Sequence, residues 1–283
     1  MGHPQNRENE NMAPNASQRA VGTGEQYSLA KILGIWAAAA VPMGILGWIA
    51  APALAPDIAE NPIGAAATRV GVLTVGLIWQ FVLSMIIVYR EEGDLRWSTI
   101  RRRLWLNKPR DPKTGDPRGL LWLWVVPLLV LVALLDVVLG STLDGFWVSL
   151  FPFFAEPPSF ALGSILESPA IQAQLVGAWG FLGLYIVNAV FNTFLGEEFL
   201  FRGVLLPKME GVFGKWDWVA NGVLMGIYHL HQPWGILTSV IGSVFLLSLP
   251  SKRFRCTWMA IITHSGQSVF FIFLILGIVL GLA

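Results

Sequence analysis

The sequence predicts an all-α fold, a polytopic membrane helix bundle of about seven transmembrane spans. Of the 283 residues, 54% are hydrophobic and only 13% are charged, whereas soluble domains carry about 25% charged residues. Several apolar runs are long enough to cross a hydrocarbon core of about 30 Å. The basic residues are concentrated in short segments of the chain and not along one face, so the net charge of +1 gives no indication of nucleic-acid binding.

The apolar runs fall in seven places. Two of them are short and are separated by His231, Gln232 and Pro233. Because proline cannot continue a helix, we expect these two runs to form a tight hairpin of short, buried spans. An eighth span near 146–154 is the alternative count, although this aromatic stretch also suits the membrane interface. The seven predicted spans are residues 28–52, 69–89, 119–140, 172–201, 217–231, 234–250 and 257–281.

The distribution of positive charge predicts the orientation of the bundle. Nine Lys or Arg residues lie in the 90–118 segment, and residues 119–201 contain none. The positive-inside rule puts the 90–118 loop in the cytoplasm. With seven spans, the N-terminus is then cytoplasmic. We expect a multi-pass protein of the cell membrane with three parts: a disordered polar tail (1–27), N-terminal helices (28–170) and a C-terminal core (171–283).

Ionisable side chains inside the predicted spans mark the candidate site, because each costs about 2.5–3.5 kcal/mol to insert into a membrane. Glu198 and Arg202 are four residues apart, so they share a helix face and can neutralise each other. Glu197 is turned by about 100° from Glu198 and is left free to act as a general base. The alternative interpretation is a buried ion-pair network that fixes helix packing. The five ionisable residues of the candidate site are Glu197, Glu198, Arg202, His229 and His264.

Small and polar residues accompany the two histidines. Gln267 and Ser268 share a face of the last span with His264. Gly222 and Gly226 lie on the face of the fifth span that also carries its histidine, and they allow close approach of a neighbouring helix. Two histidines and a free glutamate in neighbouring spans favour a hydrolytic site over simple packing.

Several common hydrolase motifs are absent from the sequence. It contains no H-E-x-x-H, no G-x-S-x-G and no glycine-rich phosphate loop. Asp136 stands alone near the outer end of a predicted span, so we expect no intramembrane aspartate pair. These absences disfavour a helical-motif zinc peptidase, a serine peptidase, a nucleotide hydrolase and an aspartyl intramembrane protease.

Three segments in order carry a family resemblance. Glu197–Gly203 has the pattern E-E-x-x-x-R. Tyr228–Trp234 contains His229, which is the last residue of an F-x-x-x-H pattern in which Met225 replaces the Phe. His264 begins an H-x-x-x-N pattern in which Ser268 replaces the Asn. These segments resemble the motifs of the CAAX-protease and bacteriocin-processing (CPBP) membrane endopeptidases. The resemblance covers about residues 180–281, which correspond to the four-helix core of that family.

The resemblance implies a metal-independent intramembrane endopeptidase that needs no cofactor and cuts near the cytoplasmic face. Glu197 and His229 would activate a water molecule. His264 with Ser268, or with Gln267 as a substitute, would stabilise the oxyanion that forms at the scissile carbonyl. Arg202 would hold Glu198. The implied partners are the lipid bilayer and a substrate that is a membrane-associated peptide or a lipid-anchored protein, with no nucleic acid.

Three other interpretations fit the same residues. A member of the family that lacks catalysis would act as a membrane scaffold or immunity protein, and the replacement at Ser268 favours this reading. A zinc-dependent membrane peptidase would use Glu197, His229 and His264 as ligands. A transporter with a proton relay at the midplane would use the same buried acids, although the hydropathy shows no inverted repeat.

Overall fold

The computed structural model describes residues 25–157, 160 and 168–282. The described residues form a helical bundle, and their β-type pairing is confined to one isolated bridge between Arg110 and Pro117. The predicted all-α class is therefore confirmed. The predicted polar tail lies outside the described residues as far as residue 24. Directly after it, Tyr27 is buried and its hydroxyl donates a hydrogen bond to Glu91 at 2.6 Å.

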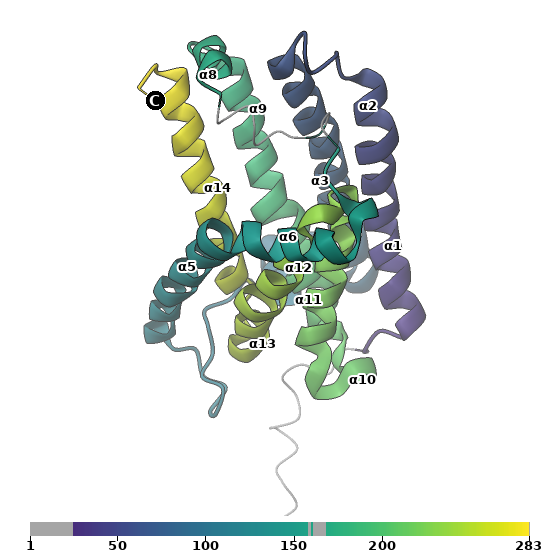
Figure 1. The fold of residues 1–283 in the computed structure, drawn as a ribbon. Helices are drawn as coiled ribbons and strands as arrows, with labels where there is room; N and C mark the ends of the chain where they lie inside the picture. The colour runs from purple at the N-terminus through teal and green to yellow at the C-terminus, as the bar shows by residue number, and fades with distance from the viewer. Residues whose placement is uncertain (1–24, 158–159, 161–167, 283) are drawn as a thin grey trace, which may run out of the picture.

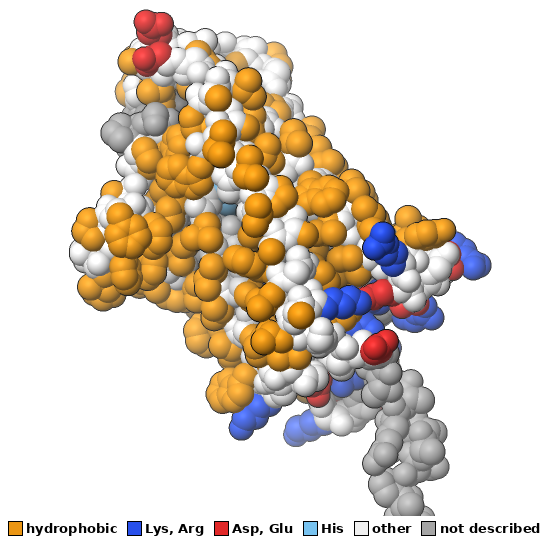
Figure 2. Space-filling view, turned by 90° about the vertical axis from the view of Figure 1, so that its right-hand side faces the viewer, with side chains coloured by type: hydrophobic (Ala, Val, Ile, Leu, Met, Phe, Trp, Pro, Cys, Tyr) orange, Lys and Arg blue, Asp and Glu red, His pale blue; other side chains and the backbone are white. Residues whose placement is uncertain are grey.

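Six helical segments in the described part of the chain are long and apolar enough to cross a membrane. The predicted span at 217–231 corresponds to helix α11 (Asp217–Tyr228), whose 12 residues extend only about 18 Å at 1.5 Å per residue. Residues 146–150 belong to the end of the third segment and Pro152–Phe154 form a 3₁₀ turn, so this stretch makes no separate span. Apolar side chains cover much of the face shown in Figure 2, and Lys and Arg gather toward its lower end. The six segments are Leu29–Leu54, Pro62–Glu92, Gly119–Leu150, Trp179–Lys208, Pro233–Phe254 and Thr257–Val279.

Helix α3 (Pro62–Glu92) is the longest element, and its ends follow from the sequence. The Asn61 side chain accepts a hydrogen bond from the backbone N–H of Gly64 at 2.8 Å, and Pro62 occupies the first helical position. Gly93 ends the helix with φ of 81°, a left-handed conformation that glycine adopts without strain. The other helices with labels in Figure 1 are α1 (Leu29–Ile45), α2 (Ala51–Leu54), α5 (Val125–Ala133), α6 (Gly140–Leu150), α8 (Pro169–Leu175), α9 (Trp179–Val190), α10 (Glu210–Phe213), α12 (Ile236–Ile241), α13 (Leu249–Phe254) and α14 (Thr257–Val279).

Helix α6 lies across the bundle about halfway up, in front of α12, whereas α1, α9 and α14 run along the bundle (Figure 1). The π-helical turn Leu134–Leu139 separates α6 from α5. Further π-helical turns interrupt the helices at Phe191–Gly196, Phe199–Leu205 and Gly242–Ser248. Such turns are rare and occur frequently at functional sites. Two of these turns, Phe191–Gly196 and Phe199–Leu205, flank Glu197 and Glu198.

Helix α11 packs closely against the segment that follows α12, as the glycines of the sequence predict. A Cβ added at Gly222 would lie 2.5 Å from Val244 Cα, and one added at Gly226 would lie 2.8 Å from Val240 Cα. These contacts are with backbone atoms, which cannot move aside independently. The predicted close approach is thus confirmed, and it holds the end of α11 against α12.

Replacing Gly222 by Ala is expected to destabilise the protein by about 1–3 kcal/mol, because the added methyl group overpacks the contact with Val244. The check is thermal unfolding of the purified protein in detergent. Gly180→Ala is the matched control, since a Cβ at Gly180 meets nothing within 4 Å. Equal melting temperatures for the two variants would contradict the expectation.

The N-terminal helices brace the C-terminal half through donors to its backbone. Arg103, in α4 (Trp97–Arg103), donates to the carbonyl oxygens of Gly203 and Val204 at 3.1 and 3.2 Å. The Trp36 indole N–H donates to the carbonyl oxygen of Leu224 at 2.7 Å. The largest apolar core lies in the same region and joins α1 and α3 to α11 and the turn Phe199–Leu205.

Candidate active site

Glu197 and Glu198 lie between two π-helical turns and are buried, with side chains 2% and 0% exposed. Glu198 Oε1 accepts a hydrogen bond from Arg202 Nη1 at 3.3 Å, and this pair is wholly buried. The same oxygen accepts a hydrogen bond from His264 Nδ1 at 2.9 Å. The pairing of Glu198 with Arg202 thus agrees with the sequence prediction, and the contact with His264 is an additional one.

Glu197 faces His229 from the opposite side of the site. The distance from His229 Nε2 to Glu197 Oε1 is 3.9 Å. His229 Nδ1 lies 3.0 Å from the carbonyl oxygen of Met225. Because a carbonyl oxygen can only accept, Nδ1 carries the hydrogen, and Nε2 is free to accept a hydrogen bond next to the Glu197 carboxylate.

Two residues that support Glu197 were not identified from the sequence. In the amide orientation that satisfies both groups, the Asn192 nitrogen donates to the two Glu197 oxygens at 3.0 and 3.3 Å. The Tyr228 hydroxyl also interacts with Glu197 and accepts a hydrogen bond from Gln80 at 2.6 Å. The Glu197 carboxylate is therefore held by Asn192 of the π-helical turn and by Tyr228 of α11, and Gln80 of α3 orients the Tyr228 hydroxyl.

The sequence signal for Asn192 is hidden by the local helix geometry. Asn192 and Glu197 are five residues apart, which on an α-helix separates them by about 140° around the axis. The π-helical turn Phe191–Gly196 has i to i+5 periodicity, so the two side chains come onto one face. Analysis with α-helical periodicity alone therefore misses the pair.

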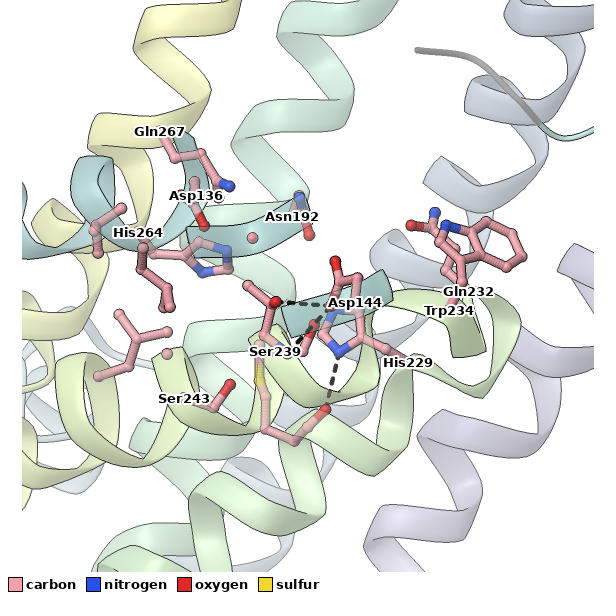
Figure 3. A pocket seen from close by; sticks show the side chains of 18 of the residues that line it. Asp136, Asp144, Asn192, His229, Gln232, Trp234, Ser239, Ser243, His264 and Gln267 are labelled. Atoms are coloured by element: carbon pink, nitrogen blue, oxygen red, sulfur yellow. Dashed lines mark hydrogen bonds between the residues drawn. The ribbon is translucent and has the colours of Figure 1, made fainter. Parts of the chain in front are cut away.

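A cavity of about 480 Å³ opens onto these residues. His229 and His264 both line it, and Figure 3 shows them on either side of the group formed by Asn192, Asp144 and Ser239. Glu197 and Glu198 lie next to His229 and His264 and are not among the residues that line the cavity. The polar and charged lining residues are Asp136, Ser141, Asp144, Asn192, His229, Gln232, Thr238, Ser239, Ser243, His264 and Gln267.

Two details of the sequence interpretation differ from the structure. Ser268 is buried and is not among the residues that line the cavity, whereas Gln267 does line it. Asp136 does not stand alone at an outer helix end. It lies in the π-helical turn Leu134–Leu139 and lines the cavity together with Asp144. The bend between α5 and α6 brings both aspartates to the site, and this bend has no evident signal in the hydropathy.

The zinc interpretation names Glu197, His229 and His264 as metal ligands. In the described part of the chain, no group of three or more His, Cys, Asp or Glu side chains has an arrangement that could hold a metal ion. Each histidine uses its Nδ1 in a hydrogen bond within the protein. A metal at this site would have only the two Nε2 atoms of these histidines available.

Residues 178–270 match a protein-family model described as type II CAAX prenyl endopeptidase Rce1-like. The matched stretch begins just before α9 and ends within α14, so it contains all three motif segments. No curated protein and no solved structure matches the chain. The family points to a protease that resides in a lipid bilayer and acts on protein substrates. The six apolar helical segments indicate a multi-pass membrane protein, and the match over residues 178–270 supports membership of the CAAX-protease and bacteriocin-processing family.

Proposed function

We propose that the protein is an intramembrane endopeptidase that hydrolyses a peptide bond with a water molecule activated by Glu197 and His229. The observation that carries this proposal is the distance of 3.9 Å between Glu197 Oε1 and His229 Nε2 beside the cavity. This distance is too long for a direct hydrogen bond and suits two groups that share one bridging water. The family match supports the same class of reaction.

In the proposed reaction, Glu197 takes a proton from the water while the water oxygen bonds to the scissile carbonyl carbon. His229 Nε2 accepts a hydrogen bond from the same water and orients it. The C–N bond then breaks, and the leaving nitrogen takes the proton from Glu197. A positioned general base of this kind contributes about 10²–10⁴-fold to the rate.

The oxyanion that forms on the substrate needs hydrogen-bond donors. Glu198 accepts from His264 Nδ1 and stabilises the imidazolium form, whose Nε2–H can donate to the oxyanion. We assign the second donor to Gln267 and not to Ser268, because Gln267 lines the cavity. One preorganised donor of this type is worth about 2.7–4 kcal/mol. The presence of Gln267 supports the catalytic interpretation over that of a silent scaffold.

The proposed substrate is a membrane-associated peptide or a lipid-anchored protein. The segment 90–118 carries nine basic residues, and the positive-inside rule puts this end of the bundle, with the N-terminus, in the cytoplasm. A substrate held at that membrane face would have to present an extended peptide to the cavity. The substrate itself can be found as a protein that accumulates uncut in membranes that lack this protein.

Cleavage is expected to survive metal chelation, because the proposed base and donors are protein side chains. The measurement is cleavage of the accumulated substrate by purified protein in liposomes, with and without phenanthroline. We expect the two rates to agree within about twofold, a difference of less than 0.5 kcal/mol in the barrier. Complete inhibition by the chelator that is reversed by added zinc would instead establish the zinc-dependent peptidase.

A further inference from the structure

We propose that Asp136 and Asp144 make the cavity selective for a substrate segment that carries a positively charged side chain. This inference rests on the proposed function and adds a substrate class to it. It concerns the wall of the cavity that faces the histidines, which is built from α5, the π-helical turn Leu134–Leu139 and α6. This wall lies outside the segment that matches the family.

Asp144 has one carboxylate oxygen engaged and one available. Asp144 Oδ1 accepts a hydrogen bond from the Thr238 hydroxyl at 2.7 Å and a longer one from the Thr238 backbone N–H at 3.4 Å. Both bonds fix the carboxylate against the start of α12. Asp144 Oδ2 has no hydrogen-bond donor among the described residues, and Figure 3 shows the side chain within the group of cavity residues. Asp144 is thus a carboxylate held in place through Oδ1, and its Oδ2 can accept a further hydrogen bond.

Asp136 is less engaged still. It makes no hydrogen bond and no salt bridge with any residue in the described ranges, and its electrostatic interactions are with His264 and Asp144. In Figure 3 its side chain lies beside those of His264 and Gln267. A carboxylate within a membrane span is rarely retained without a partner or a function. A cationic group of the substrate would supply the partner that the described residues do not.

The balance of charge in the cavity favours a cation. No Lys or Arg is among the described residues that line it. Four carboxylates lie in the lining or next to it: Asp136, Asp144, Glu197 and Glu198. The cations there are Arg202, His229 and His264, so the carboxylates are in excess even if both histidines are protonated. A cleft lined by an excess of one sign concentrates ligands of the opposite sign.

Helix α6 is what brings the two aspartates together. They are eight residues apart: Asp136 lies in the π-helical turn that precedes α6, and Asp144 lies in α6, about one turn after its start. Because α6 lies across the bundle in front of α12 (Figure 1), its Asp144 reaches Thr238 instead of facing lipid. The size of the cavity, about 480 Å³, leaves room for a peptide side chain between this wall and the histidines.

The test uses the full chain in liposomes of neutral phosphatidylcholine, so that the membrane surface does not itself attract cationic peptides. The substrates are peptides that differ at one scanned position, where they carry Lys, norleucine or Glu. We expect the wild type to cleave the best Lys peptide with kcat/KM about 10-fold higher than its norleucine counterpart. Asp144→Asn should reduce this ratio toward one, and Asp144→Lys should favour the Glu peptide.

Three further variants keep the test decisive. Asp144→Glu retains the charge and should retain the preference, which separates loss of charge from loss of folding. Glu60→Gln removes an exposed carboxylate that does not line the cavity and should leave the ratio unchanged. Asp136→Asn should also lower the Lys preference, with the effect read from the ratio because Asp136 interacts with His264.

The outcomes separate the inference from the function on which it rests. If the wild type cleaves none of the peptides, the proposed function fails. If it cleaves them without charge preference, or if Asp144→Asn and Asp136→Asn keep the preference, the selectivity is refuted and the peptidase stands. If either Asn variant loses cleavage of all peptides equally, its aspartate belongs to the chemistry, and the assignment to substrate selection is wrong.

Discussion

Replacing Glu197 by Gln is expected to lower the rate of peptide cleavage by about 10²–10⁴-fold. The amide has nearly the same shape as the carboxylate, so it fits the same buried space between Asn192, Tyr228 and His229. It cannot take a proton from water, however. The variant should therefore fold, bind substrate and fail at the step in which the water attacks the carbonyl carbon.

The measurement for Glu197→Gln is single-turnover cleavage by purified protein in liposomes, with the melting temperature measured on the same preparation. Glu60→Gln is the matched control, since it makes the same chemical change at an exposed position outside the cavity. Cleavage by Glu197→Gln at the wild-type rate would remove this residue from the mechanism. A large loss of folded protein would instead favour the interpretation of the glutamates as a packing network.

Replacing Arg202 by Met is expected to destabilise the protein by about 3–5 kcal/mol, because it leaves a buried carboxylate without its countercharge. Arg202 is 0% exposed and donates to Glu198, to the Met225 sulfur and to the carbonyl oxygen of Ser243. It therefore ties three segments together. Glu198 Oε2 and Arg202 Nε have no hydrogen-bond partner among the described residues. No second partner of Glu198 Oε2 would therefore compensate for the loss of Arg202.

The loss at Arg202 is measured as the fraction of folded protein in membranes and as the shift in thermal unfolding. We expect Arg202→Met to reduce both more than Glu197→Gln does. The double variant Glu198→Gln with Arg202→Met should recover part of the loss, because it removes the uncompensated charge. Wild-type abundance and melting temperature in Arg202→Met would show that the pair has no structural role.

The sequence predicted the helical class and the pairing of Glu198 with Arg202 because both depend on short-range patterns. Apolar length identifies a membrane helix, and the four-residue spacing of Glu198 and Arg202 identifies a shared face. The roles of these residues in catalysis remain predictions. One expected span, 217–231, is not among the six membrane-crossing segments: it is the short helix α11, whose Gly222 and Gly226 pack against Val244 and Val240 within the bundle.

Other parts of the site depend on geometry that these patterns do not contain. Asn192 reaches Glu197 through a π-helical turn, and Asp136 reaches the cavity through the bend before α6. Gln80 acts on Tyr228 across a separation of 148 residues. None of these relations follows from hydropathy or from α-helical spacing. Whether Gln267 or Ser268 faces the cavity depends on how α14 is rotated about its own axis. Two adjacent positions in a sequence do not determine this rotation.

The hydrogen bonds donated by Arg103 and Trp36 limit how the gene can be divided or recombined during evolution. They serve the carbonyl oxygens of Gly203, Val204 and Leu224, all of which belong to the segment that matches the family. A gene fragment that encodes only residue 171 onward would produce a core that lacks these donors, and the hydrocarbon core of a bilayer offers no water to replace the donor to Leu224. Recombination at that boundary would require a new set of N-terminal helices with donors in the same places. Descent should therefore preserve the two halves as one unit.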